Sequence, residues 1–261
     1  MRALLTAASG MKSQQLMVDT IANNIANANT AGFKKSQLSF RALLYQTYRE
    51  PGAATGANQR NPTGLQIGSG TEVSGASKVF QQGVLEPTSG TYDLAIQGEG
   101  FFRIRLPNGE FRFTRDGAFH LDGEGAIVTA EGYALDTAPT IPQDAISVTI
   151  AEDGTVSTMN TEGGQPSTIG TLGLFRFPNP SGLKAAGGNS YSETGASGAP
   201  QQAEPGQTGT GVLRQNYTER SNVETVDELV ALIVAQRNYE VNSRAIKVSD
   251  DMLQQVNQLI R

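Results

Sequence analysis

Histidine and cysteine, the side chains most often used for catalysis and metal binding, are almost absent from this sequence of 261 residues. His120 is the only histidine and there is no cysteine. Disulfides and thiolate metal sites are therefore excluded, and a transition-metal site or a histidine-based triad would depend on one imidazole. Because His120 lies at the lip of a predicted hairpin, we interpret it as a surface strand residue.

Pairs of carboxylates are the next candidates, since two of them can cleave a glycoside or bind calcium. Asp116 with Asp122, and Glu152 with Asp153, are the pairs in question. Each belongs to an Asp-Gly turn, where aspartate is the residue that a turn favours. The loop that starts at Asp122 is not repeated and lacks the glutamate of a calcium loop. We expect turns here, with no metal and no cofactor.

Binding of phosphate or nucleic acid has little support. Gly98-Glu99-Gly100 lacks the third glycine and the following helix of a nucleotide-binding loop. The formal net charge is −5, and the basic cluster Lys34-Lys35 is short enough to be a solvated helix end. We therefore expect no enzyme activity, no nucleic acid and no small-molecule substrate.

The strongest patterns lie at the two ends of the chain, where apolar residues recur every seven positions. Such a repeat predicts a helix with a coiled-coil seam. At the N-terminal end the repeat is Leu4, Met11, Val18 and Ile25, with Ala8, Gln15 and Ala22 between. At the C-terminal end it is Leu232, Tyr239, Ile246, Leu253 and Ile260, with Ala235, Asn242, Ser249 and Val256 between.

The C-terminal helix carries a second apolar stripe, Val234, Val241 and Val248. It begins two residues after the first stripe, which places it about 200° around the helix axis. One partner helix covers only one of these sides, so we expect a neighbouring subunit to cover the other. The alternative is a buried helix in a monomeric bundle, but no third strongly periodic helix exists in the sequence.

The limits of both helices can be predicted. Gly32 can take the left-handed conformation that ends a helix, and Phe33 is the apolar residue that often follows, so the first helix is expected over residues 2–30. The second helix is expected to begin near Ser221 or Thr225, because each starts a capping-box pattern.

Between the helices, apolar residues alternate with polar ones and glycine-containing turns recur, which predicts β-hairpins. The expected hairpins are centred on Pro107–Glu110, Asp122–Gly125 and Asp153-Gly154. Two Gly-rich stretches, 50–75 and 185–211, are interpreted as connectors. The predicted fold class is α+β, with long terminal helices that form a coiled-coil-like domain, a central all-β module and discontinuous domains.

The segment that decides the function is Asp19–Lys34, which contains four asparagines although asparagine is a poor helix former. Their amides can bond across a crowded helix bundle. This segment resembles the N-terminal signature of bacterial flagellar rod and hook proteins, and its motif residues are Asn23, Asn24, Asn27, Asn29, Thr30, Gly32, Phe33 and Lys34.

Other segments extend the resemblance along the whole chain. Gly98–Phe102, Phe113–Gly117 and Gly125–Tyr133 are similar to the family's central β-module, and Ser221–Val223 with Ala235–Ser243 is similar to its C-terminal motif. The rod-specific stretch Gly64, Leu65, Gln66, Ile67 and Gly68 most closely resembles members from the distal section of the rod.

The resemblance implies three discontinuous domains. Residues 1–31 and 223–261 would form a helical inner tube. Residues 32–76 and 205–222 would form an intermediate domain with an extended segment at about 50–70. Residues 77–204 would form an outer β domain. A structural protein that polymerises into the distal rod, the hollow drive shaft that transmits torque to the hook, is then expected.

The implied partners are further copies of the chain, other rod proteins, the hook protein, the surrounding P and L ring proteins and the flagellar type III export apparatus. The apolar start Ala3–Ala8 is too short for a secretory signal, so we expect export without a cleaved signal peptide, to the rod between periplasm and outer membrane. Alternatives are another rod or hook component or, with less support, a coiled-coil surface adhesin.

Overall fold

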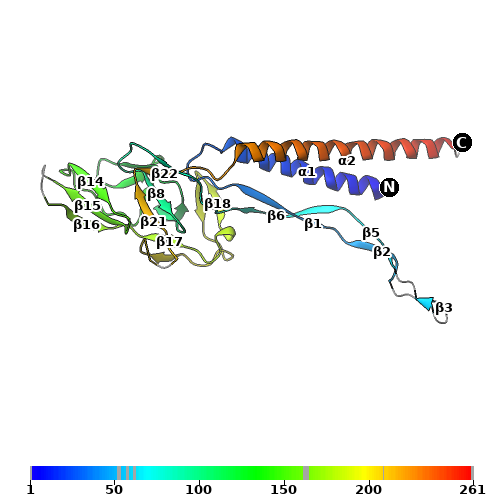
Figure 1. The fold of residues 1–261 in the computed structure, drawn as a ribbon, viewed down its shortest axis with the longest axis horizontal. Helices are drawn as coiled ribbons and strands as arrows, with labels where there is room; N and C mark the ends of the chain where they lie inside the picture. Colours follow the sequence, from blue (N-terminus) through cyan, green and yellow to red (C-terminus); the bar gives the residue numbers. More distant parts are fainter. Residues whose placement is uncertain are drawn as a thin grey trace. The chain divides into compact units, whose positions relative to one another are not determined.

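The chain folds as two long helices at its ends and a mostly β region between them, as the α+β prediction requires (Figure 1). The computed structural model describes residues 2–51, 54–56, 59–60, 63–160, 165–207 and 209–259. The described residues form two compact units: one contains 1–25, 36–77 and 224–261, and the other 26–35 and 78–223. The chain thus passes between the units four times.

Helices α1 (Arg2–Ala26) and α2 (Thr225–Leu259) lie side by side in the first unit and run in opposite directions (Figure 1). Asn24 Nδ2 donates to Glu228 Oε2 at 3.3 Å, and a Cβ on Gly10 would lie 3.0 Å from Asn242 Nδ2. In both contacts the residue numbers add up to 252, which defines one antiparallel register. Glycine at position 10 permits this close approach.

One predicted helix end is confirmed and the other is wrong. Helix α2 begins at Thr225, one of the two expected positions. Helix α1 ends at Ala26, four residues before the predicted end, and turns follow it. Gly32 does have a positive φ of 66°, but it lies in these turns, six residues after the helix ends, where it serves packing instead of a helix cap.

The first unit also contains a β-ribbon, which includes much of the predicted connector 50–75. Strand β1 (Ser36–Ala42) pairs with β6 (Thr71–Lys78), and β2 (Tyr45–Arg49) pairs with β5 (Leu65–Gly68). Between β2 and β5 in the sequence, β3 (Ala54–Gly56) pairs with β4 (Gln59–Arg60). The connector interpretation of 50–75 is therefore wrong for β5 and most of β6.

The second unit holds the remaining strands. Its largest sheet has seven strands in the order β11-β12-β13-β9-β10-β19-β18. These are β9 (Phe102–Arg105), β10 (Phe111–Thr114), β11 (Phe119–Leu121), β12 (Ile127–Thr129), β13 (Ala134–Leu135), β18 (Lys184–Gly187) and β19 (Ser190–Ser192).

Smaller sheets complete this unit. A three-stranded sheet contains β14 (Ser147–Ile150), β15 (Thr155–Met159) and β16 (Ser167–Thr171). The pairs are β17 (Leu174–Arg176) with β20 (Gln201–Ala203), β21 (Val212–Gln215) with β8 (Leu94–Gln97), and β22 (Tyr217–Glu219) with β7 (Leu85–Pro87). A 3₁₀ helix spans Pro180–Gly182. The three predicted hairpins are confirmed as β9-β10, β11-β12 and β14-β15.

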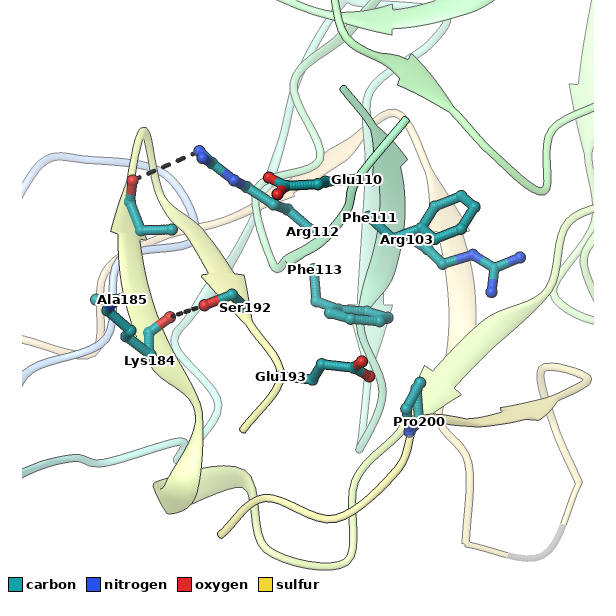
Figure 2. Close-up of a pocket in the computed structure, with 11 residues that line it drawn as sticks. Arg103, Glu110, Phe111, Arg112, Phe113, Lys184, Ala185, Ser192, Glu193 and Pro200 are labelled. Atoms are coloured by element: carbon teal, nitrogen blue, oxygen red, sulfur yellow. Dashed lines mark hydrogen bonds between the residues drawn. The ribbon is translucent and has the colours of Figure 1, made fainter. Parts of the chain in front are cut away.

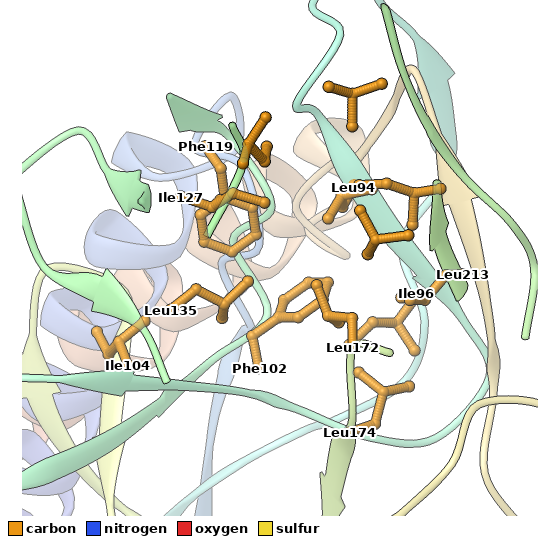
Figure 3. Close-up of a cluster of buried hydrophobic side chains, with 14 residues drawn as sticks. Leu94, Ile96, Phe102, Ile104, Phe119, Ile127, Leu135, Leu172, Leu174 and Leu213 are labelled. Atoms are coloured by element: carbon orange, nitrogen blue, oxygen red, sulfur yellow. The ribbon is translucent and has the colours of Figure 1, made fainter. Parts of the chain in front are cut away.

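Two apolar clusters hold the second unit together. Phe102 and Ile104 belong to the larger one, which Figure 3 shows around Leu94, Leu135 and Leu174. Phe113 pairs with Arg103 across the ladder, so its ring lies on the other face of the sheet, in an aromatic cluster. That cluster contains Phe101, Phe113, Phe175, Phe177, Leu183 and Tyr191. Its aromatic rings meet edge to face.

The second Gly-rich stretch is likewise more than a connector. Tyr191 is 3% exposed and lies on β19, and Ser197 is fully buried. Glycines at 187 and 188 have positive φ and supply the tight turn between β18 and β19. The connector interpretation of 185–211 is therefore wrong for β18, β19 and β20.

Candidate assembly surface

The two apolar stripes of α2 have different surroundings. On the first stripe Leu232, Ile246 and Leu253 are partly covered and Ala235 is buried, while Tyr239 is 42% exposed; Ile260 lies outside the described residues. On the second stripe the exposed fractions are 50% for Val234, 64% for Val241 and 45% for Val248. The first stripe thus faces α1, and the second remains in solvent.

More apolar residues extend the exposed side of α2 toward its start. Val226, Leu229, Val230 and Ile233 are each 46–67% exposed. Their spacing of three and four residues places them on one face of the helix. A continuous exposed stripe of this kind is typical of an interaction surface.

On α1, Leu4, Met11, Val18 and Ile25 are partly covered, as a seam requires. The residues between them differ from the prediction, because Ala8, Gln15 and Ala22 are exposed. Ala7 and Ile21 are buried in their place and Gln14 is partly covered. The seam therefore alternates in steps of three and four, beginning with three.

Because α1 covers only part of α2, we expect the backbone amides of α2 to exchange hydrogen at different rates along the helix. In the 252 register Arg2 lies opposite Asp250, so residues 251–259 of α2 have no α1 residue opposite. We expect both helix ends of the isolated chain to fray, with amides of 251–259 exchanging fastest, because a helix without tertiary cover is marginal. Hydrogen exchange read by mass spectrometry tests this, with the buried β8 as the slow reference. High protection at both ends would contradict it.

The asparagine motif lies at the end of α1. Asn24 is 2% exposed; its Oδ1 accepts from Ser36 N at 2.9 Å and its Nδ2 donates to Ser36 O at 3.0 Å. One amide therefore ties α1 to β1 and, through Glu228, to α2. Asn23 is exposed on the helix.

The rest of the motif follows the helix end. Asn27 Oδ1 accepts from Thr30 Oγ1 at 3.3 Å, and Asn29 Oδ1 accepts from Arg220 Nη2 at 3.1 Å. Gly32 packs so closely within the second unit that a Cβ would lie 2.5 Å from Asp116 N. Any side chain at position 32 would displace that backbone.

Phe33 and Lys34 anchor the same segment in the second unit. Phe33 is 8% exposed, with Lys78 Nζ 4.4 Å from the centre of its ring. Lys34 is fully buried, and its Nζ donates to Glu219 Oε1 at 2.6 Å and to Gln81 O at 2.7 Å. The prediction that Lys34 is a solvated helix end is wrong.

Glu219 is the centre of a buried ionic cluster formed with Lys34 and Arg115. Its carboxylate accepts from Lys34 Nζ, from Gly83 N at 2.8 Å and from Arg115 Nη1 at 3.4 Å. Burial lowers the pKa of Lys34 and of Arg115, and the Glu219 charge opposes part of that effect. One carboxylate thus neutralises two buried cations only in part.

Hydrogen bonds also join the points where the chain enters and leaves the second unit. Lys35 N donates to Asn222 Oδ1 at 2.8 Å, and Asn222 Nδ2 donates to Val79 O at 2.8 Å. Val79 N in turn donates to Lys35 O at 3.0 Å, and Gly32 N to Glu219 O at 2.8 Å. These bonds fix the segments 32–35, 78–83 and 217–223 against one another.

Tyr191 offers a spectroscopic test of this packing, because burial raises its pKa to about 12. We expect a tyrosine ionisation with a midpoint of about 12 that the Tyr191→Phe variant lacks. Unfolded tyrosine loses its proton at about 10, so this group's stabilising contribution is complete below about pH 10 and is lost as the pH rises to about 12. Ultraviolet absorbance of tyrosinate measures the midpoint. An unchanged high-pH phase in Tyr191→Phe would contradict the assignment.

The rod-specific stretch Gly64, Leu65, Gln66, Ile67 and Gly68 lies at β5 and its preceding residue. The side chains of Leu65 and Ile67 are 53% and 45% exposed, and on the paired β2 those of Tyr45 and Tyr48 are 60% and 55% exposed. A two-stranded ribbon is marginally stable by itself. Helix α1 contacts this one at Tyr48, where the Arg2 guanidinium lies 5.3 Å from the centre of the ring. These apolar side chains form a second uncovered surface of the first unit.

His120, Asp122 and Asp153, which were considered for catalysis, lie on a strand and in two turns. His120 is exposed on β11. Asp122 Oδ1 accepts from Glu124 N at 2.6 Å and Asp153 Oδ1 from Thr155 N at 2.9 Å, as aspartates in turns do. Across the described residues, no histidine and carboxylate side chains gather in a group that could hold a metal ion. Within the same residues, neither helix is long and apolar enough to cross a membrane.

A groove of about 800 Å³ lies beside β10, β18 and β19 (Figure 2). Its two arginines are already engaged. Arg103 Nε donates to Asp136 Oδ2 at 2.8 Å and its guanidinium lies 4.1 Å from the centre of the Phe175 ring; Arg112 donates to Ala186 O at 3.5 Å. Glu110 and Glu193 add opposite charge. The groove therefore presents no converging set of like charges.

Sequence reasoning missed Glu219 and Arg115 altogether. Both are buried, at 1% and 4% exposure, and charged residues are rarely buried unless paired. Arg115 lies in the quoted segment Phe113–Gly117, but nothing local distinguishes its charge from a surface one. Glu219 ends the short strand β22, where Tyr217 on the same face is 37% exposed, so alternation gives no sign that the carboxylate is buried.

Two paired terminal helices with an apolar stripe left in solvent, beside a separate β-rich unit, are features of a structural protein. Three family models match the chain. They are described as "Flagella basal body rod protein" over residues 4–34, "Flagellar hook protein FlgE/F/G D1 domain" over 95–158 and "Flagellar basal body rod FlgEFG protein C-terminal" over 214–259. The chain belongs to the flagellar basal-body rod protein family.

Relatives match along the full length. The chain is 45% identical to "Flagellar basal-body rod protein FlgG" of Borreliella burgdorferi over 100% of this chain and 99% of the relative. It is 46% identical to the protein of that name from Caulobacter vibrioides, over 99% of each. Two proteins of Bacillus subtilis also match. The chain is 40% identical to its "Flagellar basal-body rod protein FlgG" over 100% of each chain, and 29% identical to its "Flagellar hook-basal body complex protein FlhP" over 98% of each.

Proposed function

We propose that this chain is a structural component of the distal rod of the bacterial flagellum, where copies polymerise into the hollow shaft that transmits torque from motor to hook. The observation that carries the proposal is the uncovered apolar stripe of α2, which a single copy cannot bury. Many such modest contacts, repeated along a polymer, add up to resistance against bending and twisting.

In this proposal the paired terminal helices form the coiled-coil-like inner tube. The β-ribbon of residues 36–78 contacts neighbouring copies through Tyr45, Tyr48, Leu65 and Ile67, which stiffens the shaft. The outer β domain of about 77–204 faces the P and L rings. Other rod proteins and the hook protein would be the axial neighbours. The flagellar type III export apparatus would deliver the chain without a cleaved signal peptide, and no step requires an active site.

Basal bodies from a strain that lacks this gene test the proposal, with a complemented strain beside it. Electron microscopy is expected to show rods that stop before the distal section, and complementation should restore them. An intact rod and hook in the deletion strain would overturn the distal-rod assignment.

The second candidate is another rod or hook component of the same family. The difference between 40% identity to FlgG and 29% to FlhP within one organism favours the distal rod. The same images separate the two, because loss of a hook component would leave a complete rod.

A further inference from the structure

The exposed faces of α1 and α2 carry charges at matched spacing. On α1, Lys12 and Asp19 are exposed and seven residues apart; on α2, Arg244 and Asp251 are exposed and also seven residues apart. Seven residues correspond to nearly two turns, so each pair lies along one line of its helix. Among the described residues none of the four has an ion-pair partner.

These charges lie on the exposed sides of both helices. At 100° per residue, Lys12 and Asp19 lie about 80° from the line of Leu4 and Met11, amid the exposed Leu5, Ala8 and Leu16. Arg244 and Asp251 continue the line of Val226, Val230 and Ile233. We call these two surfaces the outer face of α1 and the outer face of α2.

We propose that the outer face of α1 binds the outer face of α2 of a second copy in antiparallel register, with Lys12 against Asp251. The same register places Asp19 against Arg244. The inference rests on the proposed function, because it names which surfaces meet in the polymer. Copies that are rotated about the long axis of the helix pair and translated along it keep their directions, so α1 runs antiparallel to α2 of a neighbour too.

The register between copies differs from the register within one copy. The residue numbers of two facing positions add up to 252 within a copy and to 263 between copies. This difference of eleven residues is a translation of about 16 Å along the helices at 1.5 Å per residue. The translation also places a neighbour's α1 beside residues 251–259 of α2, which have no α1 residue opposite within their own copy.

Charge exchange tests the register without changing the net charge of the chain. The α1 exchange is Lys12→Glu with Asp19→Lys, and the α2 exchange is Arg244→Glu with Asp251→Lys. Each exchange alone is expected to abolish distal rods and swimming in the complemented deletion strain, because like charges then face each other along every contact. Both exchanges together are expected to restore them. All four positions are exposed, so the monomer is expected to fold in every variant.

A third exchange controls for the opposite orientation. Glu240→Lys with Lys247→Glu would restore complementarity to the α1 exchange only if the helices of two copies ran parallel. Rescue by this exchange, rescue by neither, or normal rods from one exchange alone would each overturn the proposal. Complementation with the unmodified chain tests the proposed function separately from the register. If the unmodified chain restores distal rods but the charge exchanges do not give the expected results, only the inferred register is wrong.

The absence of cysteine from the chain permits a direct second measurement. Asp19→Cys with Arg244→Cys in one chain should give disulfide-linked oligomers when isolated basal bodies are oxidised, because the two positions are eleven residues out of register within one copy. Asp19→Cys with Val226→Cys, also on the outer faces but far out of register, is the matched control. Monomers only, or equal linking in the control, would overturn the proposal.

Discussion

Glu219→Gln is expected to lower the free energy of unfolding of the second unit by about 3–5 kcal/mol, the usual cost of removing one partner from a buried ion pair. The carboxylate is inaccessible to solvent, as is the Lys34 ammonium, and Arg115 is 4% exposed on its side chain. Glutamine keeps the shape but leaves two buried cations without a counter-charge. Urea unfolding of the full chain, followed by tyrosine circular dichroism, measures the loss.

The matched control is an exposed pair in the same chain. Arg41 Nη2 and Glu72 Oε2 are 2.9 Å apart, but their side chains are 65% and 50% exposed. Glu72→Gln is therefore expected to cost about 0.5 kcal/mol or less, since water and salt screen such a pair. If Glu219→Gln costs no more than Glu72→Gln, the cluster does not stabilise the unit.

The pH dependence of the Glu219→Gln variant provides a further check. Burial already lowers the pKa of Lys34 in the native protein, and removal of the carboxylate would lower it further. Between that lowered pKa and the ordinary value of 10.5, the unfolded chain binds more protons than the folded chain. The stability of the variant should therefore rise with pH in this window. Lys34→Met added to the variant is expected to remove this rise, and a rise that persists would point to another group.

The terminal helices and the hairpins could be predicted because their signals are local. The seven-residue repeat that includes Leu232 and Ile246 marks the face that α1 covers, and Asn108-Gly109 marks the turn between β9 and β10. The start of α2 at Thr225 follows in the same way. In each case, residues a few positions apart determine the element.

The missed features depend on residues far apart in the sequence. Lys34 and Glu219 are separated by 185 positions, and their charges look like surface charges until the chain brings them together. The ribbon strands β1 and β6 face solvent on most positions, so burial imposes little alternation on them. The end of α1 was misplaced for a related reason, since Gly32 serves a contact with Asp116 instead of a helix cap.

Val241→Asp is expected to prevent assembly while leaving the fold of one copy intact. Val241 is 64% exposed on the second stripe of α2, so an aspartate there is solvated in the monomer. In the polymer the same charge would be buried against a neighbour without a partner, at a cost of several kcal/mol in each contact. The expected result is loss of distal rods and of swimming, with an unchanged urea unfolding curve for the purified chain. Val241→Thr, which keeps the shape without a charge, is the control and should retain rods.

Substitutions on the first stripe separate the two surfaces of α2. Ile246→Asp and Leu253→Asp place a charge on partly covered positions, and both are also expected to stop assembly while the β-rich unit stays folded. Ile246→Asp should in addition reduce the helical signal of the monomer, because Ile246 lies on the stripe that α1 covers, whereas Val241→Asp should not. Measured side by side, circular dichroism of the monomers and electron microscopy of basal bodies distinguish the seam within a copy from the surface between copies. Normal motility with either first-stripe variant, or with Val241→Asp, would contradict an assembly that depends on both sides of the terminal helix.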